Sequence, residues 1–212
     1  MSTAGQFVIQ QRLTDRRDFA LLGSTPALMQ PGFGALSPLL AGHRYVVGRG
    51  GLYVEARSAV MHAVACVAPS PVALPFGEVR PFLNLPDGGL PRDLIEAAVG
   101  RARACVPDEW AGVIVYAESG YRLVEPEVLS RSAGHVSYAR SGIEEATVVV
   151  DLHSHGTGAA FFSAKDDEDD TDRGGFYLAM VLGEVTSALV SVAARLVVHG
   201  HFARVSAALE LR

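Results

Sequence analysis

The stretch TVVVDLHSHGTGAAFFSAKD, residues 147–166, carries the strongest signals of fold and chemistry in this chain. The valines at its start are typical of a strand buried in the middle of a sheet. Because side chains alternate along a strand, His153 and His155 are expected to project to the same side where that strand ends. Two neutral imidazoles placed in this way are a natural pair of metal ligands. The stretch therefore predicts a buried strand that delivers two ligands to one site.

Asp166 can supply a third ligand where the chain returns after the glycine-rich segment 156–158. Three protein ligands leave a fourth position open, which is typical of a catalytic zinc site, whereas a structural site closes that position with a fourth ligand, usually a cysteine. The chain has two cysteines, Cys66 and Cys105, and neither is close in sequence. The pattern predicts a catalytic site for Zn²⁺ rather than a structural one.

A hydrolytic zinc site also needs a base and a donor for the developing oxyanion. Glu109 is the leading candidate for the base, because it precedes an apolar, β-branched run at 112–116 that predicts a neighbouring buried strand. Glu118 is the alternative, although its glycine-containing surroundings favour a turn. Ser163 has two possible roles: its hydroxyl can donate to the oxyanion, or it can cap the turn that leads to Asp166.

These residues resemble the JAMM motif of the MPN-domain zinc metallopeptidases, which reads His-x-His, seven residues, Ser, two residues, Asp. His153, His155, Ser163 and Asp166 fit that spacing without a gap. The family also carries a glutamate upstream, often in a Pro-x-Glu-x-x-Gly context, and residues 107–112 match it as PDEWAG. The resemblance covers about residues 90–200, and a spacing of this kind is fairly specific.

The resemblance implies an α/β (α+β) fold in which a central β-sheet is flanked by helices. It implies zinc held by His153, His155 and Asp166, with Glu109 as the base and Ser163 as the oxyanion donor. The reaction would be hydrolysis of a peptide or isopeptide bond, at the C-terminal tail of a ubiquitin-like or sulfur-carrier protein or its conjugates. Gly156 departs from the family, because many members have proline there.

The alternative is a non-catalytic MPN scaffold, or a metal-binding subunit of a plasmid-associated complex. Many MPN relatives lack the zinc ligands, whereas this chain has the complete set, so the enzyme ranks first. The run AFFSAKDDEDD at 160–170 and the N-terminal extension resemble the prokaryotic branch, in particular the protein A family of PRTRC (ParB-related, ThiF-related cassette) systems. That setting would imply a ThiF-like activating enzyme as a functional neighbour.

The rest of the chain divides at a turn signal, LPDGG at 85–89. Residues 1–88 are expected to form short strands and turns in an N-terminal extension or subdomain, and residues 89–212 the JAMM/MPN-like catalytic domain. Hydrophobic periodicity predicts one helix and several strands in this second part, and the acidic run is expected to form a loop. The helix is expected at 93–106 and the strands at 112–116, 121–124, 147–152, 176–182 and 188–198.

Composition excludes several classes of protein. The chain has 212 residues, a net charge of −5 and 49% hydrophobic residues, which is too hydrophobic for a disordered protein. The acidic balance argues against direct binding to nucleic acid. The most apolar stretch, 176–198, is interrupted by Glu184 and Arg195, so it is not expected to span a membrane. With no apolar leader visible, a soluble cytoplasmic protein is expected.

Three further patterns receive other interpretations. The acidic run 166–172 lacks the glycine and glutamate of an EF-hand loop, so it is interpreted, apart from Asp166, as a solvated face. The second His-x-His, His199 and His201, has no serine and aspartate at the required spacing and is expected at an exposed strand end. A zinc nucleobase deaminase would need H-x-E and P-C-x-x-C signatures, and both are absent from the sequence.

Overall fold

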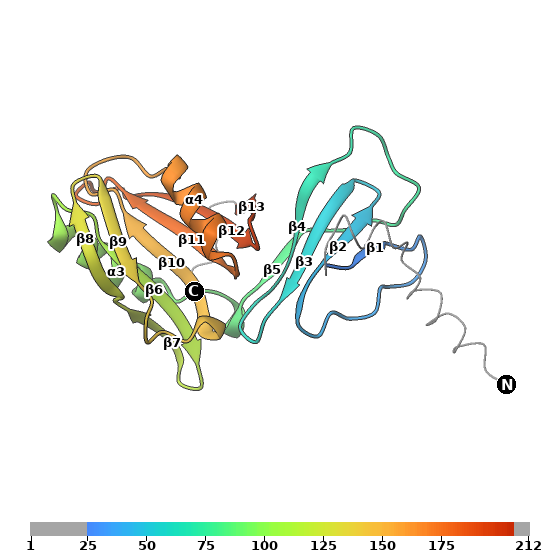
Figure 1. The fold of residues 1–212 in the computed structure, drawn as a ribbon, viewed down its shortest axis with the longest axis horizontal. Helices are drawn as coiled ribbons and strands as arrows, with labels where there is room; N and C mark the ends of the chain where they lie inside the picture. The colour runs from blue at the N-terminus through green and yellow to red at the C-terminus, as the bar shows by residue number, and fades with distance from the viewer. Residues whose placement is uncertain (1–24, 206–212) are drawn as a thin grey trace.

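The computed structural model describes residues 25–205, which form a mixed α/β fold with two large sheets and a separate hairpin (Figure 1). The first sheet has five strands in the order β1-β2-β3-β4-β5, and all but the first pair are antiparallel. Strands β2 and β3 form a tight hairpin in which Gly48 pairs with Gly51. The strands are β1 (Ala27–Met29), β2 (Gly42–Gly48), β3 (Gly51–Arg57), β4 (His62–Pro69) and β5 (Phe82–Asn84).

The second sheet has six strands in the order β13-β12-β11-β10-β6-β7. Strand β10 is central: it runs parallel to β11 on one side and antiparallel to β6 on the other. The strands are β6 (Ala111–Ala117), β7 (Gly120–Val124), β10 (Val148–Ser154), β11 (Phe176–Gly183), β12 (Ser191–Val198) and β13 (His201–Arg204). Two short 3₁₀ turns, η1 (Pro86–Gly88) and η2 (Glu145–Thr147), precede the helix α3 and strand β10.

Helices cover the two faces of this second sheet. On one face, helix α3 (Arg92–Cys105) buries Ala98 and Ala102 in the same core as Leu152 of β10 and Ala63 of the first sheet. On the other face lies helix α4 (Ala164–Arg173), above a smaller core that contains Tyr177. The expected fold class, a central sheet flanked by helices, is confirmed. Among the described residues, the helices lack the length and hydrophobicity that a membrane span requires.

Helix α4 corrects the interpretation of the acidic run as a loop with a solvated face. Ser163 caps this helix, and its Oγ accepts a hydrogen bond from the Asp166 amide at 3.2 Å. Asp170 is 6% exposed, and its carboxylate accepts hydrogen bonds from Tyr177 at 2.7 Å and from the Arg195 guanidinium at 2.6 Å. A carboxylate is buried at such a position only when it is paired. One face of the acidic helix is therefore anchored to the sheet.

A separate hairpin at residues 127–139 was not predicted from the sequence. Strands β8 (Glu127–Ser132) and β9 (His135–Ala139) pair only with each other in the described sheets. None of their residues, all of which the structure describes, is buried. Every residue of β8 is exposed, so this strand has no apolar side, and the alternation in β9 is confined to Val136 and Tyr138. Gly134 between two short runs was the available signal of a hairpin.

The two large sheets meet at a group of histidines. The ring of His43 in β2 stacks on that of His199, with centroids 4.0 Å apart, and Tyr45 Oη lies 2.5 Å from His201 Nε2. His199 is exposed in the turn between β12 and β13, as expected, whereas His201 begins β13 and is half-buried. Burial lowers the pKa values of His43 and His199, and the neighbouring histidines lower them further. The folded protein therefore favours neutral rings at this contact.

This contact predicts a loss of stability in mild acid. His43 and His199 have lowered pKa values when folded, so below pH 6.5 the unfolded chain binds more protons. Their contribution is then present above pH 6.5 and declines as the pH falls through the folded pKa values. We expect the melting temperature to drop between pH 7.5 and 5, and to drop less in the double variant His43→Gln/His199→Gln. An identical pH dependence in both proteins would contradict this.

Candidate metal centre

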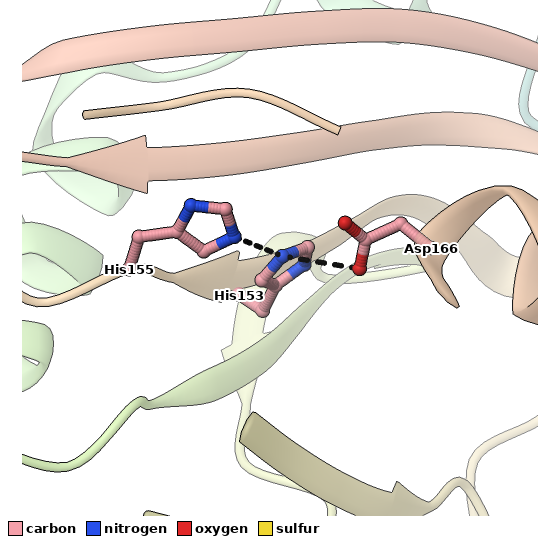
Figure 2. A group of neighbouring side chains, drawn as sticks. All are labelled: His153, His155 and Asp166. Atoms are coloured by element: carbon pink, nitrogen blue, oxygen red, sulfur yellow. Dashed lines mark hydrogen bonds and ion pairs between the residues drawn. The ribbon is translucent and has the colours of Figure 1, made fainter. Parts of the chain in front are cut away.

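His153, His155 and Asp166 meet at the end of β10, on the face that α4 covers (Figure 2). His153 Nε2 lies 3.3 Å from His155 Nε2 and 3.4 Å from Asp166 Oδ1. One nitrogen or oxygen of each residue lies within 4.8 Å of those of the other two, and all three side chains are partly buried. Two imidazole nitrogens and a carboxylate oxygen converging in this way are a donor set that suits zinc.

The strand register positions the two histidines. His153 is the last but one residue of β10, paired with Ala111 of β6 and Val181 of β11. His155 follows the strand, and its amide donates to Leu182 O at 2.8 Å. The next segment packs tightly on β11, since a Cβ on Gly183 would lie 2.1 Å from the Ala160 nitrogen. The loop after the histidines is thus held against the sheet.

Hydrogen bonds orient two of the three candidate ligands. His155 Nδ1 lies 3.1 Å from Ala159 O, an arrangement in which Nδ1 carries the proton and Nε2 keeps its lone pair. Asp166 Oδ2 accepts from the Ser163 amide at 2.6 Å and from its hydroxyl at 2.7 Å, so Oδ1 is left facing His153. Burial lowers the pKa of His153, which favours the neutral ring that a metal ligand must be. The residues present therefore fit a zinc ion.

Glu109 reaches the same cavity from the neighbouring strand. It lies two residues before Ala111, the partner of His153, and it is 7% exposed. Burial raises the pKa of Glu109 to about 7, and the charge of Asp166 contributes to the rise. A carboxyl group that exchanges a proton near neutral pH is suited to general acid–base chemistry. Glu109 and the three candidate ligands all line one cavity.

The alternative base, Glu118, lies elsewhere. It belongs to the turn that joins β6 to β7, at the opposite end of β6 from Ala111. A strand of seven residues is ~20 Å long. The structure thus brings Glu109, and not Glu118, to the three candidate ligands.

The cavity beside the candidate ligands has a volume of about 470 Å³. Helix α4 forms one wall, and the β8–β9 hairpin, which sequence reasoning missed, forms another through residues 133–138. Ser163 also lines it, but its hydroxyl hydrogen bonds to Asp166, which is the capping role considered from the sequence. The cavity is an open groove that leads to the three candidate ligands. The buried carboxyl group of Glu109 lies beside these ligands.

Comparison with known proteins gives two family matches. Residues 15–86 match a domain of unknown function, DUF2016, and residues 91–197 match the prokaryotic homologs of the JAB domain. Among solved structures, protein DSY2949 from Desulfitobacterium hafniense is similar, with 18% identity over 55% of this chain and 88% of that one, and a TM-score of 0.43. No curated protein matches the chain. Because the JAB match covers half of its residues, the chain belongs to the family of prokaryotic homologs of the JAB domain.

Proposed function

We propose that this protein is a zinc-dependent hydrolase that cleaves a peptide or isopeptide bond, with His153, His155 and Asp166 as the metal ligands. One observation carries the proposal: ligand atoms of these three residues lie within 4.8 Å of one another, in a cavity that the buried Glu109 also lines. If these residues only stabilised the fold through ion pairs, two histidine nitrogens would not need to face each other. An open three-residue donor set beside an acid is the arrangement of a hydrolytic metal site.

In the proposed reaction, the bound metal and Glu109 have separate roles. A bound zinc ion would supply Lewis acidity, which polarises the scissile carbonyl and makes water a better nucleophile. Glu109 takes a proton from the attacking water on a carboxylate oxygen while the water oxygen bonds to the carbonyl carbon. As the C–N bond breaks, Glu109 returns that proton to the leaving nitrogen. The products are a carboxylic acid and an amine, and Glu109 regains its starting state.

Ser163 has two candidate contributions. Its hydroxyl and amide hold Oδ2 of Asp166, which directs Oδ1 to His153. We also propose that its hydroxyl can turn from Asp166 to donate to the oxyanion when a carbonyl is bound, as the resemblance to the JAMM motif implies. Loss of the first contribution lowers activity by lowering the zinc content. Loss of the second lowers turnover while zinc stays bound.

The variant Ser163→Ala separates these contributions. Loss of the cap should destabilise the protein by about 1 kcal/mol. If the oxyanion role holds, turnover per bound zinc should also fall by about 10²–10³, the usual cost of one oxyanion donor. Zinc content, melting temperature and turnover are measured on one preparation. Full turnover per bound zinc would leave Ser163 with the capping role alone.

The proposed substrate is the C-terminal tail of a ubiquitin-like or sulfur-carrier protein, or a conjugate of one, with the reaction in the cytoplasm. A ThiF-like activating enzyme, as in a PRTRC system, is the proposed functional neighbour, and neither a nucleic acid nor a membrane is a proposed partner. These proposals rest on the resemblance to the JAMM motif and on membership of the JAB family. We also propose residues 1–88 and 89–212 as the two domains.

Metal removal tests the proposed reaction. A linear fusion of a ubiquitin-like protein to a fluorescent protein is incubated with the full-length chain before and after treatment with 1,10-phenanthroline. We expect the chelator to abolish cleavage at the fusion joint, and one equivalent of zinc per chain to restore it. Zinc binding without cleavage of any such fusion would instead favour a non-catalytic, metal-binding scaffold. Cleavage that persists without metal would contradict the mechanism.

A further inference from the structure

Asp151 is a buried carboxylate that the proposed chemistry does not use. It lies two residues before His153 on β10, so both side chains lie on the same face of the sheet, and both line the cavity. Its exposed fraction is 4%. A carboxylate in such a place is costly unless it is paired and hydrogen bonded. The residues that pair with Asp151 therefore indicate its role.

The partners of Asp151 come from two walls of the groove. Tyr138, in β9 of the hairpin, donates from Oη to Oδ1 at 2.7 Å. Arg173, the last residue of α4, donates to Oδ2, and its guanidinium lies 5.4 Å from the centre of the Tyr138 ring. Arg140, just after β9, lies 3.4 Å from the same oxygen. One carboxylate thus joins the hairpin and the end of α4 to the strand that carries His153.

Electrostatics keeps this group intact. The pKa of Tyr138 is raised well above its ordinary value, by burial first and then by the charge of Asp151, so Tyr138 remains a hydrogen-bond donor. The side chain of Arg140 is 5% exposed, and Asp151 and Glu145 are the carboxylates beside it. Removing the charge of Asp151 would leave the buried Arg140 with Glu145 as the one carboxylate beside it, and a buried charge that loses a partner is destabilising.

The hairpin has little else to fix its position. All the residues of β8 are exposed and those of β9 are at most half-buried, and an isolated two-stranded hairpin is marginally stable in water. The Glu109 amide donates to Ser132 O at 2.8 Å, which holds the turn end of β8. Tyr138 lies near the other end of the hairpin, in β9. The two ends are thus held separately, one beside the candidate base and one by Asp151.

We propose that Asp151 is a positioning residue, which fixes the β8–β9 hairpin and the end of α4 against β10 and so sets the width of the groove beside the metal ligands. Use of this groove by a substrate rests on the proposed function. The attachment of the hairpin to Asp151 does not, because it is a property of the protein without metal or substrate.

Hydrogen exchange measures the attachment directly. Tyr138→Phe removes one hydroxyl and keeps the ring, and Asp151→Asn removes the charge. We expect amides of residues 127–139 to exchange about tenfold faster or more in Tyr138→Phe, the size expected from losing one hydrogen bond to a charged group. Amides of β10 and β11 should be unchanged. The matched control is Tyr121→Phe, since the Tyr121 hydroxyl donates to Pro86 O at 3.0 Å, away from the groove.

The binding of two hydroxamates then distinguishes an effect on the groove from an effect on the metal site. Acetohydroxamate can reach a zinc ion alone, whereas tetraalanyl hydroxamate also needs the groove. In the zinc-loaded protein, Tyr138→Phe should weaken binding of tetraalanyl hydroxamate about tenfold and leave acetohydroxamate and zinc content unchanged. A purely structural role of Tyr138 would weaken both probes alike.

The possible failures are distinct. Exchange in residues 127–139 that stays at the wild-type rate in both variants, or that rises equally throughout the protein, would overturn the positioning role. Equal affinity of wild-type protein for the two hydroxamates would overturn the use of the groove. Failure of wild-type protein to bind zinc would overturn the proposed function, while the exchange result would still decide the role of Asp151.

Discussion

Replacing His153 by alanine is expected to remove zinc from the purified protein and to abolish hydrolysis. His153 Nε2 lies between His155 Nε2 and Asp166 Oδ1, at 3.3 and 3.4 Å, so the substitution removes the central member of the group. Even residues that only orient metal ligands cost 10–100-fold in affinity when they are changed, so loss of a ligand should cost more than about 100-fold. Zinc affinity is measured by competition with a chromophoric chelator.

The matched control is the double variant His199→Ala/His201→Ala, which removes the other His-x-His pair. Its histidines lie at the contact with the first sheet, where His201 meets Tyr45 and His199 stacks on His43. This control should keep its zinc, although its melting temperature should fall. Zinc lost from the control and retained in His153→Ala would move the metal site to the contact between the sheets.

Glu109→Gln is expected to keep zinc and the fold but to hydrolyse substrate about 10²–10⁴-fold more slowly, the usual contribution of a general acid–base group. Glutamine has the size of glutamate but cannot accept the proton. Since Glu109 is 7% exposed and its pKa is raised to about 7 by burial, a neutral amide should be tolerated in its place. Turnover and zinc content are measured on the same sample.

Glu118→Gln serves as the control for Glu109, because Glu118 lies in the turn at the far end of β6. Its turnover should match that of the wild type. If Glu118→Gln were inactive and Glu109→Gln active, proton transfer would have to be assigned to Glu118. Equal activity in both variants and the wild type would remove the general base from the mechanism.

Much of the second sheet could be predicted because its central strands are buried on both faces. Val149, Val150 and Leu152 have no exposed surface, and such strands leave continuous apolar runs in a sequence. Helix α3 was predicted from its apolar spacing and observed at Arg92–Cys105. The group of His153, His155 and Asp166 was predicted from spacing alone. Its metal binding remains a prediction.

The rest depends on contacts between distant residues. Aspartate is a poor helix former, so the composition of 164–173 indicated a loop. The helix is stabilised instead by the cap at Ser163 and by Arg195, 25 residues beyond Asp170, which no local window contains. The hairpin contacts the rest of the protein through the hydrogen bond from Tyr138 to Asp151 and the one from the Glu109 amide to Ser132 O. A local sequence pattern could not have shown that Arg195 pairs with Asp170 or that Asp151 pairs with Tyr138.

The position of zinc in a crystal tests the proposed metal site directly. Crystals of the zinc-loaded protein would be measured at the zinc absorption edge. We predict one anomalous peak per chain, about 2.0–2.2 Å from a ring nitrogen of His153, a ring nitrogen of His155 and an oxygen of Asp166. A peak at His43, His199 and His201, or no peak in a protein incubated with excess zinc, would contradict the account.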